Sequence, residues 1–130
     1  MPKNNSFQPY ALSVLRLMAG FTFLEHGFQK LFGFLAGAHF NKPALFSLLW
    51  FAGVLETTGG LLVAAGLFTR VAAFVLCGEM AVAYFKQHEP HGFWPIQNGG
   101  ELAVLYCFIF LLLMSAGGGP ISLDRLIRGK

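Results

Sequence analysis

Charged residues are scarce in this chain: they make up 12% of its 130 residues, while 55% are hydrophobic. In soluble domains about a quarter of the residues are charged, so this composition argues against a soluble fold and favours an integral membrane protein. A soluble helical bundle is the alternative. The formal net charge is only +3 and the basic residues are scattered. Since nucleic acid is bound by concentrated basic surfaces, we expect no nucleic-acid partner.

Cysteine is also rare, and the sequence lacks the common cofactor motifs. Cys77 and Cys107 lie in apolar segments and form no Cys-x-x-Cys pair, so we expect neither a structural disulfide nor a zinc site. There is no haem attachment motif, no glycine-rich dinucleotide motif and no cysteine cluster for iron and sulfur. We therefore expect no covalently bound cofactor, and any electron would come from a partner protein or a diffusible quinone.

Long apolar runs fill most of the chain. The run from residue 44 to 69 has 26 residues, with Glu56 as its only ionisable side chain. As a helix it would extend roughly 39 Å, more than the ~30 Å hydrocarbon core of a bilayer. We predict one domain, residues 1–130, with an all-α integral membrane fold. We expect this fold to be a four-transmembrane-helix antiparallel bundle with spans at about 9–28, 44–68, 70–87 and 98–115, followed by a short amphipathic C-terminal tail at 121–130.

Four spans place both termini on the same side of the membrane. More basic residues fall on that side than on the other, and this bias predicts that both termini are cytoplasmic. The residues counted are Lys3, Arg70, Arg125, Arg128 and Lys130 on the side of the termini, and Lys30, Lys42 and Lys86 on the opposite side.

Three charged residues inside the predicted spans reach a similar depth. If consecutive spans are antiparallel, Arg16, Glu56 and Glu79 lie roughly 10 to 13 Å from the cytoplasmic face at ~1.5 Å per residue. Because a buried carboxylate needs a partner, we predict a buried ion network in which Arg16 is paired with Glu56, Glu79 or both. Two interpretations stay open, namely a structural network that holds the helices together and a path for protons or a substrate.

A second polar layer is predicted near the opposite face. It combines the ends of the spans with the loop from His88 to Asn98, and its residues form a candidate quinone-binding or other ligand-binding site. The alternatives are simple interfacial solvation and a metal site formed by His26, His88 and His91. We assign no metal, because His-Glu-Pro-His lacks the spacing that places two ligands on one helical face. The candidate ligand-binding residues are His26, Lys30, Lys86, His88, His91, Trp94, Asn98 and Glu101.

Several motifs follow one another in a fixed order along nearly the whole chain. They are Arg16-Leu17 with Gly20; His26-Gly27-x-x-Lys30-Leu31-Phe32-Gly33; Glu56 with Gly59-Gly60 and Gly66-Leu67-x-Thr69-Arg70; Asn98-Gly99-Gly100-Glu101-Leu102; and Gly117-x-Gly119 with Ser122-Leu123-Asp124. This ordered set resembles the DoxX family. The resemblance implies a small four-helix, multi-pass protein of the bacterial cytoplasmic (inner) membrane. It also implies an association with quinone-linked oxidoreductases and with oxidative and thiol stress, but no agreed catalytic residue.

Three functions are compatible with these observations. The first is a redox-associated subunit that binds quinone or quinol, acting if at all as an accessory part of a quinone-linked oxidoreductase. The second is a non-enzymatic membrane scaffold that recruits soluble partners, and the third is a small proton-coupled transporter. The lipid bilayer is the expected environment in each case, with redox proteins and a second copy of the chain as candidate partners.

Overall fold

The computed structural model describes residues 6–35, 37 and 40–129. Every regular element in these ranges is helical, which confirms the predicted all-α class. Lys3 and Lys130, which were counted for the orientation, lie outside the described residues. In chain order the elements are α1 (Gln8–Phe32), α2 (Leu48–Ala65), α3 (Thr69–Ala83), the π-helical turn η1 (Tyr84–His88), the 3₁₀ turn η2 (Glu89–His91), α4 (Pro95–Asn98), α5 (Glu101–Ala116) and α6 (Leu123–Arg128).

The helix ends are set by local capping rather than by hydrophobicity. α1 continues past residue 28 to Phe32 and ends at Gly33, which adopts a left-handed conformation with φ 73°. α2 begins at Leu48 rather than at residue 44, because the Ser47 hydroxyl accepts a hydrogen bond from the backbone N–H of Trp50. The predicted loop from 88 to 98 contains two short helical elements, η2 and α4.

Helix length and hydropathy alone do not establish four spans. Within the described ranges, α2 is the one helix that is both long and apolar enough to cross a bilayer by itself. α5 is apolar but has 16 residues, and α3 has 15 before it passes into η1.

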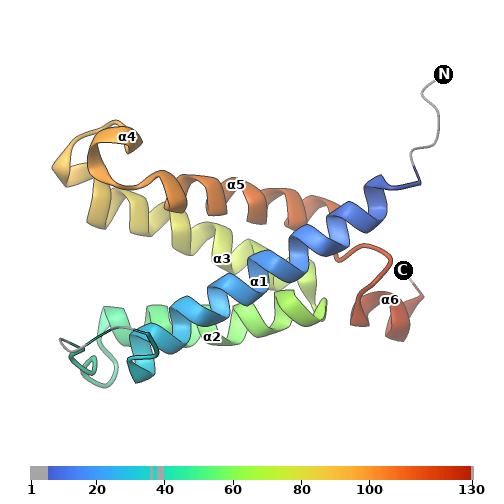
Figure 1. The fold of residues 1–130 in the computed structure, drawn as a ribbon, viewed down its shortest axis with the longest axis horizontal. Helices are drawn as coiled ribbons and strands as arrows, with labels where there is room; N and C mark the ends of the chain where they lie inside the picture. Colours follow the sequence, from blue (N-terminus) through green and yellow to red (C-terminus); the bar gives the residue numbers. More distant parts are fainter. Residues whose placement is uncertain (1–5, 36, 38–39, 130) are drawn as a thin grey trace.

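The long helices form two antiparallel pairs, α1 with α2 and α3 with α5 (Figure 1). The pairs meet near α6 and diverge toward α4, so the bundle is closed at one end and spread at the other (Figure 1). We call these the α6 end and the α4 end. Contacts between the pairs are few, and most are made by α2 with α3.

Glycines allow α1 and α2 to pack with their backbones in contact. A Cβ added to Gly20 would lie 2.2 Å from the backbone nitrogen of Ala64, and one added to Gly27 would lie 2.5 Å from that of Thr57. A Cβ on Gly60 would lie 2.7 Å from the backbone nitrogen of Leu24. These clashes involve backbone atoms, so a side chain at any of the three positions would push the helices apart.

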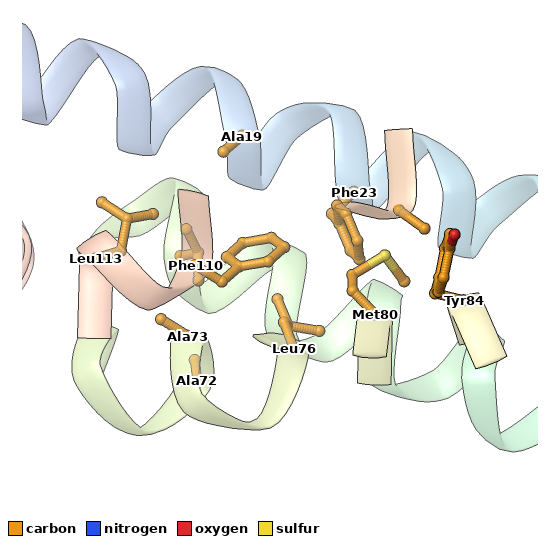
Figure 2. Packing of buried hydrophobic residues seen from close by; sticks show 11 residues of the cluster. Ala19, Phe23, Ala72, Ala73, Leu76, Met80, Tyr84, Phe110 and Leu113 are labelled. Carbon is orange, nitrogen blue, oxygen red and sulfur yellow. The ribbon is translucent and has the colours of Figure 1, made fainter. Parts of the chain in front are cut away.

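A small aromatic and aliphatic core joins the two pairs. Phe23 from α1 meets Leu76 and Met80 from α3 and Phe110 from α5 (Figure 2). The ring of Phe23 packs edge to face against Phe110, with centroids 4.8 Å apart. All four residues are buried, and this cluster holds α3 and α5 against the middle of α1.

Asp124 ties α6 to the start of α3. Its two carboxylate oxygens accept hydrogen bonds from the backbone N–H groups of Phe68, at 2.8 Å, and Thr69, at 3.0 Å. These N–H groups belong to the first turn of α3, which has no side-chain cap of its own. Burial acts to raise the pKa of Asp124, but the backbone hydrogen bonds outweigh it and leave the pKa below its usual value.

We expect Asp124→Ala to lower the free energy of unfolding at pH 7 by about 0.5–2 kcal/mol, the usual contribution of an N-cap. The folded-state pKa of Asp124 is depressed, so its contribution is complete above the unfolded-state pKa of ~3.9 and is lost as the pH falls through the folded-state value. Thermal unfolding in detergent should therefore differ between the two proteins at pH 7, begin to converge as the pH falls below about 4, and coincide only below the depressed folded-state pKa. Glu89→Ala is the matched control, and a difference that persists unchanged in acid would contradict the assignment.

Candidate functional site

Arg16 lies at the closed α6 end of the bundle and does not pair with either glutamate, contrary to the prediction. Its Nη1 donates hydrogen bonds to the carbonyl oxygens of Val63 and Ala64, both at 2.8 Å, at the end of α2. Its Nε donates to the carbonyl of Gly118 at 2.9 Å, and its Nη2 donates to that of Ile121. The side chain is buried, with 3% exposed. It thus joins carbonyl groups at the end of α2 to carbonyl groups in the loop between α5 and α6.

The depth estimate failed because α1 and α2 do not begin and end at the same level. Arg16 lies beside Val63 and Ala64, and Gly27 lies beside Thr57. The first two turns of α1 therefore extend past the end of α2, and Glu56 faces the region of residues 27–30 rather than Arg16.

Lys30 is the partner of Glu56. Its ammonium nitrogen lies 2.6 Å from both carboxylate oxygens. The Glu56 side chain is 2% exposed, whereas that of Lys30 is 29% exposed. The buried charge pair thus joins α1 to α2 near the α4 end, one turn from the end of α1.

Glu79 adds a second carboxylate to this pair. It lies on α3, close enough to Glu56 and Lys30 for the charges of the three side chains to interact. Its Oε2 atom is buried and has no hydrogen-bond partner among the described residues. Two neighbouring carboxylates repel each other when both are ionised, and a proton on one of them would relieve this repulsion. A site with two carboxyl groups and one ammonium group has no net charge if one of the carboxyl groups is protonated.

A pocket of about 210 Å³ opens beside this cluster, between the two helical pairs. Its lining includes two charged side chains, Lys30 and Glu56, and two histidines, His26 and His88. The rest of the wall is largely apolar and aromatic, and includes Phe23, Met80, Ala83, Leu102, Ala103 and Tyr106. Polar groups converging in an otherwise apolar pocket are typical of a small-molecule binding site.

Aromatic packing and a backbone contact orient the two histidines. The ring of His26 packs edge to face against Phe23 and Tyr106, with centroids 6.0 and 6.4 Å away. Nδ1 of His88 lies 3.3 Å from the carbonyl oxygen of Asn98. Since a carbonyl only accepts, this hydrogen bond requires a proton on Nδ1 and leaves Nε2 of a neutral His88 as an acceptor.

The other predicted ligand-binding residues do not line the pocket. Asn98 organises the loop instead: its Nδ2 donates to the carbonyl of Gly92 and to the Tyr84 hydroxyl, and its Oδ1 accepts from Gly100. Lys86, His91, Trp94 and Glu101 are exposed outside the pocket. Of the eight candidates, the structure therefore brings together His26, Lys30 and His88. In the described part of the chain, no group of three or more His, Cys, Asp or Glu side chains could hold a metal.

The sequence interpretation missed Tyr106, Met80 and Gln87 as parts of this wall. Neither Tyr106 nor Met80 carries a charge that would mark it within an apolar span. Tyr106 does have a recognisable signal, since a tyrosine in the middle of a helix needs a partner for its hydroxyl. That hydroxyl donates to Thr22 at 2.7 Å and so crosses from α5 to α1.

Comparisons with known proteins identify a family and several similar proteins. The family model of DoxX matches residues 11–89, a range that contains His26, Lys30, Glu56, Glu79 and His88. The chain is 42% identical to an uncharacterised protein of Haemophilus influenzae, over 92% of each chain. It is 33% identical to an uncharacterised membrane protein of Mycobacterium tuberculosis, over 90% of this chain and 81% of that one. No solved structure matches.

Proposed function

Since this chain belongs to the DoxX family, we propose that it is a multi-pass membrane protein whose pocket binds the head group of a quinone or quinol and exchanges protons with it. The observation that carries this proposal is the pocket itself. It places a lysine, a buried carboxylate and two histidines against an apolar aromatic wall. The redox role, the four spans and the cytoplasmic termini are parts of the same proposal.

The outer surface of the bundle supports a membrane location. Large apolar side chains are exposed along all four long helices, far beyond the small patches usual for a soluble monomer. They include Val14, Leu17 and Phe21 on α1; Phe51 and Leu61 on α2; Phe74 and Val82 on α3; and Leu105, Phe108 and Leu112 on α5. In water these side chains would favour aggregation, whereas acyl chains would cover them.

The helix lengths are compatible with four crossings. At ~1.5 Å per residue, α1 extends about 37 Å and α2 about 27 Å. Together with η1 and η2, α3 reaches residue 91, for a total of about 34 Å. α5 extends about 24 Å and is preceded by the short helix α4. Arg70, Arg125 and Arg128 all lie at the α6 end, which by the positive-inside tendency would face the cytoplasm of a bacterial inner membrane.

The dimensions and polarity of the pocket fit a single-ring head group. Its volume of about 210 Å³ is below the roughly 300–1,000 Å³ of sites for drug-sized ligands, so a prenyl tail would remain outside among lipids. The ammonium of Lys30 can donate a hydrogen bond to a carbonyl oxygen, and Nε2 of His88 can accept one from a hydroxyl. Phe23 and Tyr106 provide flat apolar surfaces for a ring.

The acid pair provides a place to hold a proton. A bound quinone would supply two-electron chemistry coupled to two protons. Glu56 and Glu79 can share a proton beside Lys30, and His26 and His88 line the same pocket with imidazole groups that can donate or accept a proton. The electrons would come from a redox partner protein, because the sequence has no motif for an electron carrier of its own.

The test is a binding measurement with matched histidine variants. We expect the purified chain in nanodiscs to bind a short-tailed benzoquinone, with His26→Ala and His88→Ala each weakening binding roughly tenfold, the effect of losing about one hydrogen bond. His91→Ala is the control, because it removes the same side chain from an exposed position outside the pocket.

Equal losses in all three variants, or no binding by the wild type, would contradict the proposal. Proton flux in liposomes that depends on Glu56 without any added quinone would instead favour a proton-coupled transporter. Retention of a soluble partner by variants that no longer bind benzoquinone would favour the scaffold.

A further inference from the structure

The charges of the described residues are segregated along the bundle. All four arginines and the single aspartate lie at the α6 end, whereas the five glutamates and the three described lysines, Lys30, Lys42 and Lys86, lie in the other half or in its loops. Arg16 is used to hold the end of α2. Three guanidinium groups and one carboxylate therefore remain around the outside of this end.

These groups surround a second pocket, of about 520 Å³, which the quinone proposal does not use. Arg70, Arg125 and Arg128 line it together with Asp124 and the loop from Gly117 to Pro120. Arg70 donates two of its hydrogen bonds to the carbonyls of Met114 and Ser115 at the end of α5. Its position is therefore fixed by the fold, and it adds a positive charge to the wall of the pocket.

The other two guanidinium groups retain most of their donors. The structure gives Arg125 and Arg128 no side-chain hydrogen bond within the described residues. Arg128 lies over the ring of Phe68, 5.0 Å from its centroid, an arrangement that leaves its in-plane N–H groups available. Asp124 is occupied with the N–H groups of α3, so the pocket keeps an excess of positive charge with unused donors.

The helix that carries these arginines also carries exposed apolar side chains. Leu126 is 79% exposed and Ile127 is 66% exposed, and Ile121 just before α6 is 61% exposed. A short helix with apolar residues beside arginines is typical of a segment lying in the membrane interface, with its arginines at the level of the lipid phosphates. The hydrogen bonds of Asp124 hold α6 beside the pocket.

We propose that this pocket binds the head group of an anionic phospholipid, with Arg125 and Arg128 donating to its phosphate and Arg70 contributing charge. The proposal rests on the membrane location in the proposed function but not on quinone binding. If the α6 end is cytoplasmic, it would face the anionic surface of that leaflet. Bound lipid would link α3, α5 and α6, which all contribute to the wall.

The experiment compares lipids, a soluble anion and two charge-matched double variants. We expect phosphatidylglycerol to raise the Tm of the purified chain in neutral detergent more than phosphatidylcholine does, and native mass spectrometry to retain one such lipid. R125Q/R128Q should weaken phosphatidylglycerol binding about tenfold or more, since each basic residue near an anionic surface contributes on the order of 1 kcal/mol. K42Q/K86Q removes the same charge at the α4 end and should leave binding unchanged.

Three results would overturn this inference. They are equal stabilisation by the two lipids, equal losses in both double variants, and stabilisation by inorganic phosphate as large as that by phosphatidylglycerol, which would indicate a soluble-anion site. Recovery of the whole chain from the soluble fraction would overturn the membrane location as well. Loss of benzoquinone binding with an intact lipid preference would affect the proposed function alone.

Discussion

Replacing Arg16 by leucine is expected to leave little folded protein. The change removes the donors for the carbonyls of Val63, Ala64, Gly118 and Ile121 at a position that is 3% exposed. Each hydrogen bond to a charged group contributes about 1.5–3 kcal/mol, and a buried carbonyl left without another donor adds a desolvation cost, although those of Val63 and Gly118 keep Gly66 and Ser13 as donors. The combined loss is at least several kcal/mol, comparable with the total stability of roughly 5–15 kcal/mol of a typical domain.

The contrast with Arg16→Lys tests whether hydrogen-bond geometry or charge matters. Lysine keeps the charge but donates from one nitrogen, whereas the guanidinium donates from three nitrogens to α2 and to the loop after α5. We expect R16K to be intermediate in thermal unfolding and in yield from membranes. Leu17→Ala, on the exposed face of the same helix, is the control. An R16L protein as stable as wild type would show that these contacts contribute little.

The second large effect concerns the Lys30–Glu56 pair. Removing Lys30 and removing Glu56 should lower the free energy of unfolding by different amounts. Lys30→Met leaves a carboxylate that is 2% exposed without its counterion, and breaking a buried pair in this way costs about 3–5 kcal/mol. Glu56→Gln leaves a lysine that is 29% exposed and whose flexible chain can reach water. We therefore expect K30M to lower the free energy of unfolding more than E56Q does.

A double-mutant cycle measures this coupling directly. The double variant K30M/E56Q contains no unpaired buried charge from this pair, so it should be more stable than K30M alone. Additive effects, or an E56Q protein less stable than K30M, would contradict the charge-pair assignment. Lys86→Met, which removes an exposed lysine at the same end, controls for the change of net charge.

The helical class and the buried faces of the helices could be predicted from the sequence. The pairing of the charged side chains could not. Helical periodicity puts Arg16, Gly20, Phe23, Gly27 and Lys30 on one face of α1, since they are three or four residues apart, and apart from the partly exposed Lys30 these residues are buried. It could not fix the offset between α1 and α2, which depends on backbone contacts such as Gly20 against Ala64. An offset of two turns exchanges one charged partner for another. The prediction therefore paired Arg16 with Glu56, Glu79 or both, whereas the structure pairs Lys30 with Glu56.

The candidate pocket was predicted only in part, again because tertiary contacts decide which polar residues come together. His26, Lys30 and His88 are polar residues near helix ends, and their residue types and positions were sufficient to find them. Asn98 and Trp94 have equally suggestive residue types, but the fold of residues 92–100 directs Asn98 into loop hydrogen bonds and leaves Trp94 62% exposed. Loop conformations of this kind are set by tertiary contacts that periodicity does not contain.

The way the two helical pairs meet has a consequence for the carboxylates. Lys30 and Glu56 belong to the α1–α2 pair, which glycine contacts make rigid, while Glu79 belongs to the α3–α5 pair. Arg16 and Asp124 hold the molecule together at the α6 end, so a relative movement of the pairs that kept these contacts would be a hinge motion, largest near α4. Widening of that hinge would admit a molecule sideways from the lipid and, in the same motion, draw Glu79 away from Glu56. Lateral entry and release of a shared proton would then be mechanically coupled.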